Sequence, residues 1–384
     1  MKILIYANIV HTNTLAGGDR IFIECAKRWI KESHEVTIVT NEVGKEYCTK
    51  GGISPQNITI WNASWADAYG VYFALIFKAL VALVNSLFYK KVEYDVVFAS
   101  SFFFPDLFPA FIAKCSFPKT KLIIASYLFV YKKWGTDYNG GKAKGFLFYL
   151  NQVFSLYIVK KYDGKILTAS SFDKKYLIET QNMDEPSVLS IRGGVDNTFF
   201  SSVQKQSLKY DAVFVGRFHP QKCISELISI WGEVVKIQPT AKLALIGNGF
   251  LEEALKEQVK AHTLEKNIIF LGQQDGVPKA MILKSSKVFA TASRYDSGNI
   301  ALDEALACGV PGIAYDLPYL HYPQGVIKIP IGDRSVFIRS ILSIIKNEEL
   351  RVRLSNSALE FAKTIDWNIT SKAICQTQMK MSPP

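Results

Sequence analysis

Several common sequence signatures are missing from this 384-residue chain. Its six cysteines are scattered without any Cys-x-x-Cys pair, so neither a zinc site nor a disulfide framework is indicated. None of its five histidines has the spacing of a metal site. The chain also has no Gly-x-x-x-x-Gly-Lys loop and no Gly-x-Ser-x-Gly elbow, which argues against a P-loop enzyme and an α/β-hydrolase.

The composition is that of a globular protein with large cores, because 49% of the residues are hydrophobic and 21% are charged. The length predicts about two domains. A formal net charge of +11 suits anionic ligands or an anionic membrane surface, whereas no zinc-finger, helix-turn-helix or RNA-binding signature points to nucleic acid. The first residues fit a strand and lack the features of a signal peptide, and we expect reduced cysteines in a cytosolic protein.

Short apolar runs alternate with helical patterns along the chain. The first example is a strand at 2–7, a helix with apolar residues at helical spacing, and a strand at 35–40, which form a βαβ unit. This alternation predicts parallel sheets covered by helices. Further strands are expected at 95–100, 121–126, 165–170, 211–217, 241–247, 267–272, 288–292 and 312–316.

The stretch from Arg294 to Pro311 carries the most specific chemistry. It follows an apolar strand, passes through a turn with a glycine, and enters a helix that a Gly-Val-Pro sequence ends. The first backbone N–H groups of such a helix lack internal partners and face the loop, which favours phosphate binding. Two carboxylates, Asp296 and Glu304, frame this end of the helix. The alternative is an ordinary βα unit with a solvated acidic residue.

This stretch resembles the C-terminal signature of the retaining GT-B glycosyltransferases of family 4 (glycosyl transferases group 1), which use a nucleotide-sugar donor. The signature has two acidic residues separated by seven, then Ala, a hydrophobic residue, Ala, Cys or Ser, Gly, any residue and Pro. Here it is Asp296, seven residues, and Glu304-Ala-Leu-Ala-Cys-Gly-Val-Pro311. The first acid is Asp where the family usually has Glu, which is longer by one methylene.

Two other segments resemble the same family. A loop with Gly17 and Gly18 precedes the first helix, and paired glycines let backbone approach a ligand closely at a helix start. Later, a Gly-Arg-x4-Lys sequence of Gly216, Arg217 and Lys222 follows a strand, and its two cations suit phosphate oxygens. A simple loop–helix junction and solvated cations are the corresponding structural alternatives.

The resemblance implies an α/β protein of the GT-B fold, with two Rossmann-like domains that face each other across a cleft. It implies an N-terminal acceptor-binding domain at 1–200 and a C-terminal domain at 207–362 that binds the nucleotide-sugar donor. The segment 188–200 resembles the family's interdomain element, which begins with a strand. A C-terminal helix or tail at 363–384 is expected to return to the N-terminal domain.

The resemblance also implies a hexosyltransferase-like enzyme that moves a sugar from a nucleotide diphosphate sugar to a glycan or lipid-linked acceptor, with retention of configuration. No cofactor is implied. No metal is expected either, because no Asp-x-Asp pair is present. Arg217, Lys222 and Asp296 are the expected catalytic residues. The cations would stabilise the leaving diphosphate, Asp296 would hold sugar hydroxyls, and Glu304 would hold ribose hydroxyls. The expected substrate-binding residues are Gly17, Gly18, Gly216, Ser297, Gly298, Asn299, Ile300 and Glu304.

The acceptor side departs from the family pattern. A histidine often follows the strand that matches 121–126 in the family, whereas this chain has Ser126 and Tyr127. The alternative function is therefore a non-catalytic GT-B-like protein that binds a nucleotide sugar or forms a membrane scaffold.

Three stretches rich in apolar and aromatic residues, 69–89, 102–112 and 146–159, lie in the N-terminal half. Lysines follow, with Lys90-Lys91 after the first, and a basic loop is expected at 132–145. We expect a peripheral protein on the anionic inner face of the cell membrane, with these stretches touching lipid. The alternatives are core packing and, for 69–89, a bilayer span that its single Lys would make costly.

Overall fold

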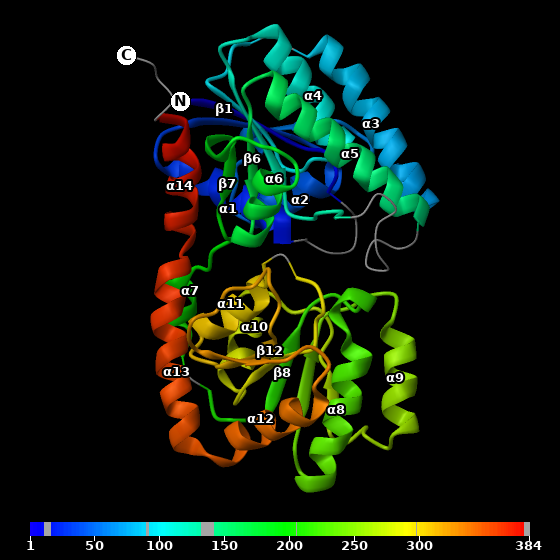
Figure 1. Cartoon of the computed structure of the whole chain (residues 1–384), viewed down its shortest axis with the longest axis vertical. Coiled ribbons are helices and arrows are strands. Elements are labelled where there is room, and N and C mark those ends of the chain that lie inside the picture. The colour runs from blue at the N-terminus through cyan, green and yellow to red at the C-terminus, as the bar shows by residue number, and fades with distance from the viewer. Residues whose placement is uncertain (11–16, 90–91, 132–141, 205, 297, 380–384) are drawn as a thin grey trace. The chain divides into compact units, whose positions relative to one another are not determined.

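The computed structural model of the protein describes residues 1–10, 17–89, 92–131, 142–204, 206–296 and 298–379 (Figure 1). The chain divides into two compact units. Unit 1 consists of Met1–Gly193 and Trp367–Pro384, and unit 2 of Gly194–Asp366. Each unit contains one sheet of parallel strands with helices packed on it, so the expected architecture of two α/β domains is confirmed.

The sheet of unit 1 has seven strands in the order β3-β2-β1-β4-β5-β6-β7. Its central strands are buried along almost their whole length, because helices cover both faces of a parallel sheet. This burial explains why the strands appear in the sequence as continuous apolar runs. The strands are β1 (Lys2–Ala7), β2 (Glu35–Thr40), β3 (Ile58–Ile60), β4 (Val96–Ala99), β5 (Lys121–Ser126), β6 (Lys165–Thr168) and β7 (Val188–Ser190).

The helices of unit 1 connect these strands, and the last one comes from the C-terminal end of the chain. They are α1 (Gly17–Lys31), α2 (Glu42–Lys50), α3 (Val71–Phe88), α4 (Phe104–Ser116), α5 (Lys142–Lys161), α6 (Ser171–Glu179) and α14 (Trp367–Met379). Helix α14 packs along α1, where the indole of Trp29 donates a hydrogen bond of 3.1 Å to the carbonyl of Ser371. The segment after 366 is thereby part of unit 1.

Helix α3 accounts for most of the apolar run at 69–89. Its single charged residue, Lys78, is fully buried, with its ammonium 2.8 Å from the Asp67 carboxylate and 2.9 Å from the carbonyl oxygen of Val10. A buried charge requires such partners, and they bind α3 to the domain, where it packs on α4. No helix within the described ranges is both long enough and apolar enough to span a bilayer.

Unit 2 has a six-stranded sheet in the order β10-β9-β8-β11-β12-β13. The strand order reverses between β8 and β11, and the carboxyl ends of strands at such a switch point are where open α/β sheets bind ligands. The strands are β8 (Ala212–Val215), β9 (Leu243–Ile246), β10 (Ile268–Phe270), β11 (Phe289–Thr291), β12 (Gly312–Tyr315) and β13 (Val326–Ile329). The helices are α7 (Asn197–Ser202), α8 (Ile224–Ile237), α9 (Glu252–Ala261), α10 (Gly276–Lys284), α11 (Ile300–Ala307), α12 (Arg334–Lys346) and α13 (Glu348–Ala362).

Unit 2 begins at Gly194, earlier than the boundary expected between 200 and 207. The backbone N–H of Val195 donates to the carbonyl of Ile365 at 2.7 Å, and the side chain of Phe200 is buried in the unit 2 core. Helix α7 therefore belongs to unit 2. Sequence patterns place this boundary poorly, because the contacts that decide it join residues about 170 positions apart in the chain.

Candidate functional site

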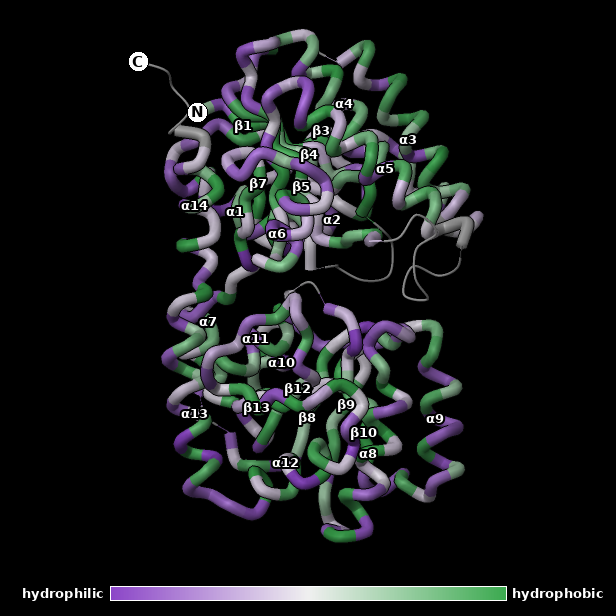
Figure 2. The backbone as a smooth tube through the Cα atoms, in the orientation of Figure 1, coloured by the Kyte–Doolittle hydropathy of each residue, from purple (hydrophilic) through white to green (hydrophobic). Residues whose placement is uncertain are grey.

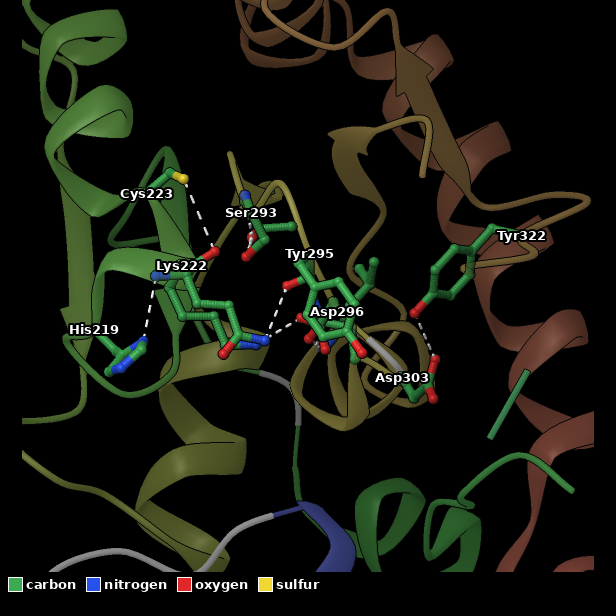
Figure 3. Close-up of polar contacts among 12 residues, drawn as sticks. His219, Lys222, Cys223, Ser293, Tyr295, Asp296, Asp303 and Tyr322 are labelled. Carbon is green, nitrogen blue, oxygen red and sulfur yellow. Dashed lines mark hydrogen bonds and ion pairs between the residues drawn. The ribbon is translucent and has the colours of Figure 1, made fainter. Parts of the chain in front are cut away.

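Two loops meet at the switch point of unit 2. One follows β8 and carries Lys222, and the other follows β11 and carries Asp296. The ammonium of Lys222 lies 2.6 Å from Oδ2 of Asp296, and Figure 3 shows the two side chains pointing toward each other. Both side chains are largely buried, so the pair holds the two loops together where ligands of such sheets bind.

A second contact joins the same loops. The side-chain amide of Gln221 donates to the carbonyl of Tyr295 at 3.3 Å. The backbone N–H of Gln221 donates to Nδ1 of His219, which caps the short helical turn Pro220–Lys222. His219 therefore shapes the loop of Lys222 (Figure 3).

Arg217 lies in the first of these loops and is exposed. In the ranges that the structure describes, its guanidinium has no hydrogen-bond or ion-pair partner. The backbone around it is fixed, since Phe218 donates its N–H to the carbonyl of Asn248 at 2.7 Å. Gly247 and Gly249 permit this approach, because a Cβ on Gly247 would lie 2.0 Å from the carbonyl oxygen of Gly216. The loop is rigid at its base and presents an unpaired cation.

Helix α11 begins beside Asp296. The side chain of Asn299 accepts a hydrogen bond from the N–H of Leu302 and caps the helix. Glu304, in the second turn, is buried, and both of its carboxylate oxygens lie within 2.9 Å of the Lys279 ammonium. The helix ends before Gly309, which has φ of 72° as the sequence predicts for a left-handed cap.

Buried polar contacts support these elements from behind. On α8, the Glu226 carboxylate accepts from the Tyr315 hydroxyl at 2.8 Å and pairs with Arg294 at 3.0 Å. On α11, the Asp303 carboxylate accepts from the Tyr322 hydroxyl at 3.0 Å (Figure 3). The Arg294 pair joins α8 to the loop after β11, and the Tyr322 contact joins α11 to the segment between β12 and β13.

The expected site residues of unit 2 lie on these neighbouring segments: Gly216, Arg217, Lys222, Asp296, Gly298, Asn299, Ile300 and Glu304. Ser297 lies outside the described residues. The structure pairs Lys222 with Asp296, and it pairs Glu304 with Lys279, a residue that sequence analysis did not select. The sequence could have indicated Lys279 through Asp275, which precedes it by four residues. In the structure, Oδ1 of Asp275 lies 2.8 Å from the Lys279 ammonium.

Gly17 and Gly18 lie at the start of α1 in unit 1. A Cβ on Gly18 would lie 2.9 Å from the ring of Tyr127, so the absent side chain makes room for this aromatic residue. The hydroxyls of Ser126 and Tyr127 are buried and have no hydrogen-bond partner within the described part of the chain. At this strand end the glycine thus has a packing role, and the ligand-binding role expected from the sequence stays a prediction.

A buried carboxylate, Asp106, connects the ends of β1 and β4. It accepts hydrogen bonds from the backbone N–H groups of Asn8 and Ile9 and from the hydroxyls of Ser100 and Ser101. Burial raises the pKa of Asp106 to about 7, although these hydrogen bonds act in the opposite direction. The carboxyl joins the loops that follow β1 and β4.

The sequence of unit 2 matches a known family. Residues 195–361 match the model for "Glycosyl transferases group 1". The phosphatidyl-myo-inositol mannosyltransferase of Mycobacterium leprae is 28% identical over 225 residues, which cover 56% of this chain and 58% of that protein. The alpha-monoglucosyldiacylglycerol synthase of Streptococcus pneumoniae is 29% identical over 107 residues, which cover 28% and 24%. These matches span less than two thirds of either relative.

Solved structures with the same fold cover nearly the whole chain. HepE from Anabaena, in complex with UDP and glucose, aligns with a TM-score of 0.74 and 15% identity over 99% of this chain and 100% of that one. A TarM variant of S. aureus, in complex with fondaparinux, alpha-GlcNAc-glycerol and UDP, aligns with a TM-score of 0.76 and 11% identity over 98% and 99%. The chain therefore has the GT-B fold, and its second unit carries the sequence pattern of the glycosyl transferases group 1.

Proposed function

We propose that the protein is a retaining glycosyltransferase of family 4 that transfers a hexose from a nucleotide diphosphate sugar to a glycan or lipid-linked acceptor. The observation that carries the proposal is the joining of the Lys222 and Asp296 loops at the switch point of unit 2. Helix α11 begins shortly after Asp296, and the exposed Arg217 lies in the Lys222 loop. Cations and helix N-terminal N–H groups together suit a diphosphate.

In the proposed reaction, the bond between the anomeric carbon and the diphosphate oxygen breaks, and an acceptor oxygen forms the new bond on the same face of the sugar. As the bond breaks, negative charge develops on the departing diphosphate oxygen, and this oxygen accepts the proton that the acceptor hydroxyl loses. Arg217 and Lys222 would stabilise that charge with the backbone of Gly216 and of 298–300. Asp296 would accept from sugar hydroxyls and Glu304 from ribose hydroxyls.

The reaction is proposed to need no metal, because side-chain cations would take the charge-neutralising role. Transfer by the purified protein should continue in EDTA. Loss of activity on chelation that Mg²⁺ or Mn²⁺ restores would refute metal independence.

A direct assay tests the function. The protein is incubated with UDP-, GDP- and ADP-sugars and with glycan and lipid acceptors, and the product is identified by mass spectrometry, with its anomeric configuration determined by NMR. Transfer with retention supports the proposal, and transfer with inversion refutes the mechanism. Nucleotide-sugar binding without transfer or donor hydrolysis would favour the non-catalytic alternative.

We further propose that unit 1 docks on an anionic membrane, where it would meet a lipid-linked acceptor. The α3 apolar face, Ile76, Leu80, Val84 and Leu87, is half-exposed. The first three recur every four residues and so lie on one side of the helix, and Figure 2 shows the apolar character of α3. An exposed apolar face of this kind marks a contact surface.

A groove between α4 and α5 supports the same proposal. It is open to the surface, has a volume of about 470 Å³, and is lined by Phe104, Phe108, Leu150, Val153, Phe154 and Tyr157. Lys161, in the last turn of α5, has its ammonium 2.9 Å from the Tyr157 hydroxyl, so a cation adjoins the apolar groove. This combination suits a lipid with an anionic headgroup. Lys90, Lys91 and most of the expected basic loop, 132–141, lie outside the described residues.

A further inference from the structure

We propose that Lys279 is the positioning residue for Glu304 and thereby sets the preference of the donor site for a ribose diol. This inference rests on the proposed function, in which Glu304 accepts hydrogen bonds from the ribose hydroxyls of the nucleotide. The Lys279 ammonium lies 2.9 Å from Oε1 and 2.8 Å from Oε2 of Glu304, so it contacts both oxygens of the carboxylate.

The contact fixes the orientation of the Glu304 carboxylate. A carboxylate has about four lone-pair positions, so a carboxylate whose two oxygens both contact an ammonium can accept further hydrogen bonds. The side chains of Lys279 and Glu304 are 7% and 6% exposed. In such surroundings a charge without its partner is strongly disfavoured, so Lys279 and Glu304 are held together as a pair.

The same lysine links Glu304 to the loop before α10. Asp275, the N-cap residue of α10, has Oδ1 2.8 Å from the Lys279 ammonium. One buried lysine thus joins carboxylates from two helices that pack on each other, α10 and α11. A shift of either helix would move the Glu304 oxygens, and hydrogen-bond recognition tolerates little displacement.

The test compares a nucleotide with an analogue that lacks the two ribose hydroxyls. Calorimetric titration of UDP, GDP and ADP identifies the nucleoside diphosphate that wild-type protein binds, and its 2′,3′-dideoxy form is then titrated. Hydrogen bonds to a charged group predict a wild-type preference for the ribose form of about 10- to 100-fold. In Lys279→Met we expect that preference to fall to about twofold or less, whereas the affinity for the dideoxy form stays close to wild type.

Lys279→Arg should restore most of the preference, because it keeps a buried cation beside Glu304. Lys256→Met is the matched control, since Lys256 also contacts two carboxylates, Glu252 and Glu253, but on the exposed surface of α9. It should retain the wild-type preference. If Lys279→Met fails to fold by circular dichroism, Lys279→Gln is titrated in its place.

The outcomes separate the two proposals. If the Lys279 variant loses affinity equally for the ribose form and the dideoxy form, Lys279 has only a structural role and the inference is overturned. A preference that Glu304→Gln abolishes but the Lys279 variants keep would also overturn it, while the proposed site remains. No preference in wild-type protein would refute the placement of Glu304 on the ribose, and the inference with it. No nucleoside diphosphate binding at all would refute the proposed donor site itself.

Discussion

The lysines of the candidate site each have carboxylate partners, and Arg217 differs from them. Lys222 contacts Asp296, and Lys279 contacts Glu304 and Asp275. A paired lysine adds less net positive charge to a ligand than a free cation does. Arg217 is therefore the residue to which we assign the main contact with the diphosphate, and its planar guanidinium suits two phosphate oxygens at once.

Arg217→Ala should lower kcat/KM for transfer by about 100-fold or more, because it removes a donor that stabilises charge on the leaving group. The free energy of unfolding should change by less than about 0.5 kcal/mol, since Arg217 is exposed. Steady-state kinetics and urea unfolding measure the two quantities. Arg353→Ala, an exposed arginine of α13, is the control and should leave both unchanged. Near wild-type turnover in Arg217→Ala would refute the assigned diphosphate contact.

Asp106 makes the stability of unit 1 depend on pH. Its pKa in the folded protein is raised from 3.8 to about 7, so the folded state binds more protons than the unfolded state between these values. The free energy of unfolding should therefore fall as the pH rises from about 4 to about 7, and should level off above that range. Each unit of pKa difference corresponds to about 1.4 kcal/mol.

Asp106→Asn should remove this dependence. An amide oxygen still accepts from the N–H groups of Asn8 and Ile9, while the NH₂ group donates to the hydroxyls of Ser100 and Ser101. The variant should match wild type at pH 5 and exceed its stability at pH 8 in urea unfolding. The exposed Asp184→Asn is the control, with wild-type pH dependence. A variant less stable than wild type at pH 8 would contradict the assignment.

At the scale of elements, the turn after β9 supports the loop that carries Arg217. Gly247 has φ of 138°, and a Cβ there would lie 2.0 Å from the carbonyl oxygen of Gly216. Gly247→Ala should displace this backbone, lower the free energy of unfolding and reduce transfer. Gly272→Ala is the matched control, because Gly272 also has positive φ, 64°, but a Cβ on it would have no atom of the described chain within 4 Å.

The control variant Gly272→Ala measures the cost of backbone strain alone. That strain should lower the free energy of unfolding by about 1–2 kcal/mol for a residue in the left-handed region. Gly247→Ala should cost about 1–3 kcal/mol more, the usual cost of overpacking. Denaturant unfolding and transfer assays on both variants measure the difference. Equal losses of stability in the two variants would show that contact with the Gly216 backbone has no energetic weight.

The elements were largely predictable, since parallel strands covered on both faces are continuous apolar runs in the sequence. The sequence did not indicate β3 and β13, which lie at the sheet edges. These strands have three and four residues, and only one of those seven residues is buried. The site was predictable only where the acids and cations follow a motif. Lys279 meets Glu304 because α10 packs on α11, and residues 25 positions apart carry no local signal of such a contact.

At the scale of the whole molecule, the net charge of +11 and the α3 apolar face both favour docking on an anionic membrane. Apolar burial would hold unit 1 at a membrane, and each lysine close to an anionic surface adds about 1 kcal/mol. Lys78 does not take part, because its charge is buried against Asp67. Docking should therefore depend on anionic lipid and weaken as salt screens the attraction.

Co-sedimentation with liposomes tests this prediction. Wild-type protein should sediment with anionic vesicles at low salt, much less with neutral vesicles, and less again at high salt. The double variant Leu80→Glu and Val84→Glu should lose most binding, because both changes place charge on the α3 apolar face. The matched control is Ile237→Glu with Val352→Glu, two similarly exposed apolar residues of unit 2, and it should bind like wild type. Absence of wild-type binding to anionic vesicles at low salt would refute docking, whereas equal binding by both double variants would show that the protein attaches through another surface.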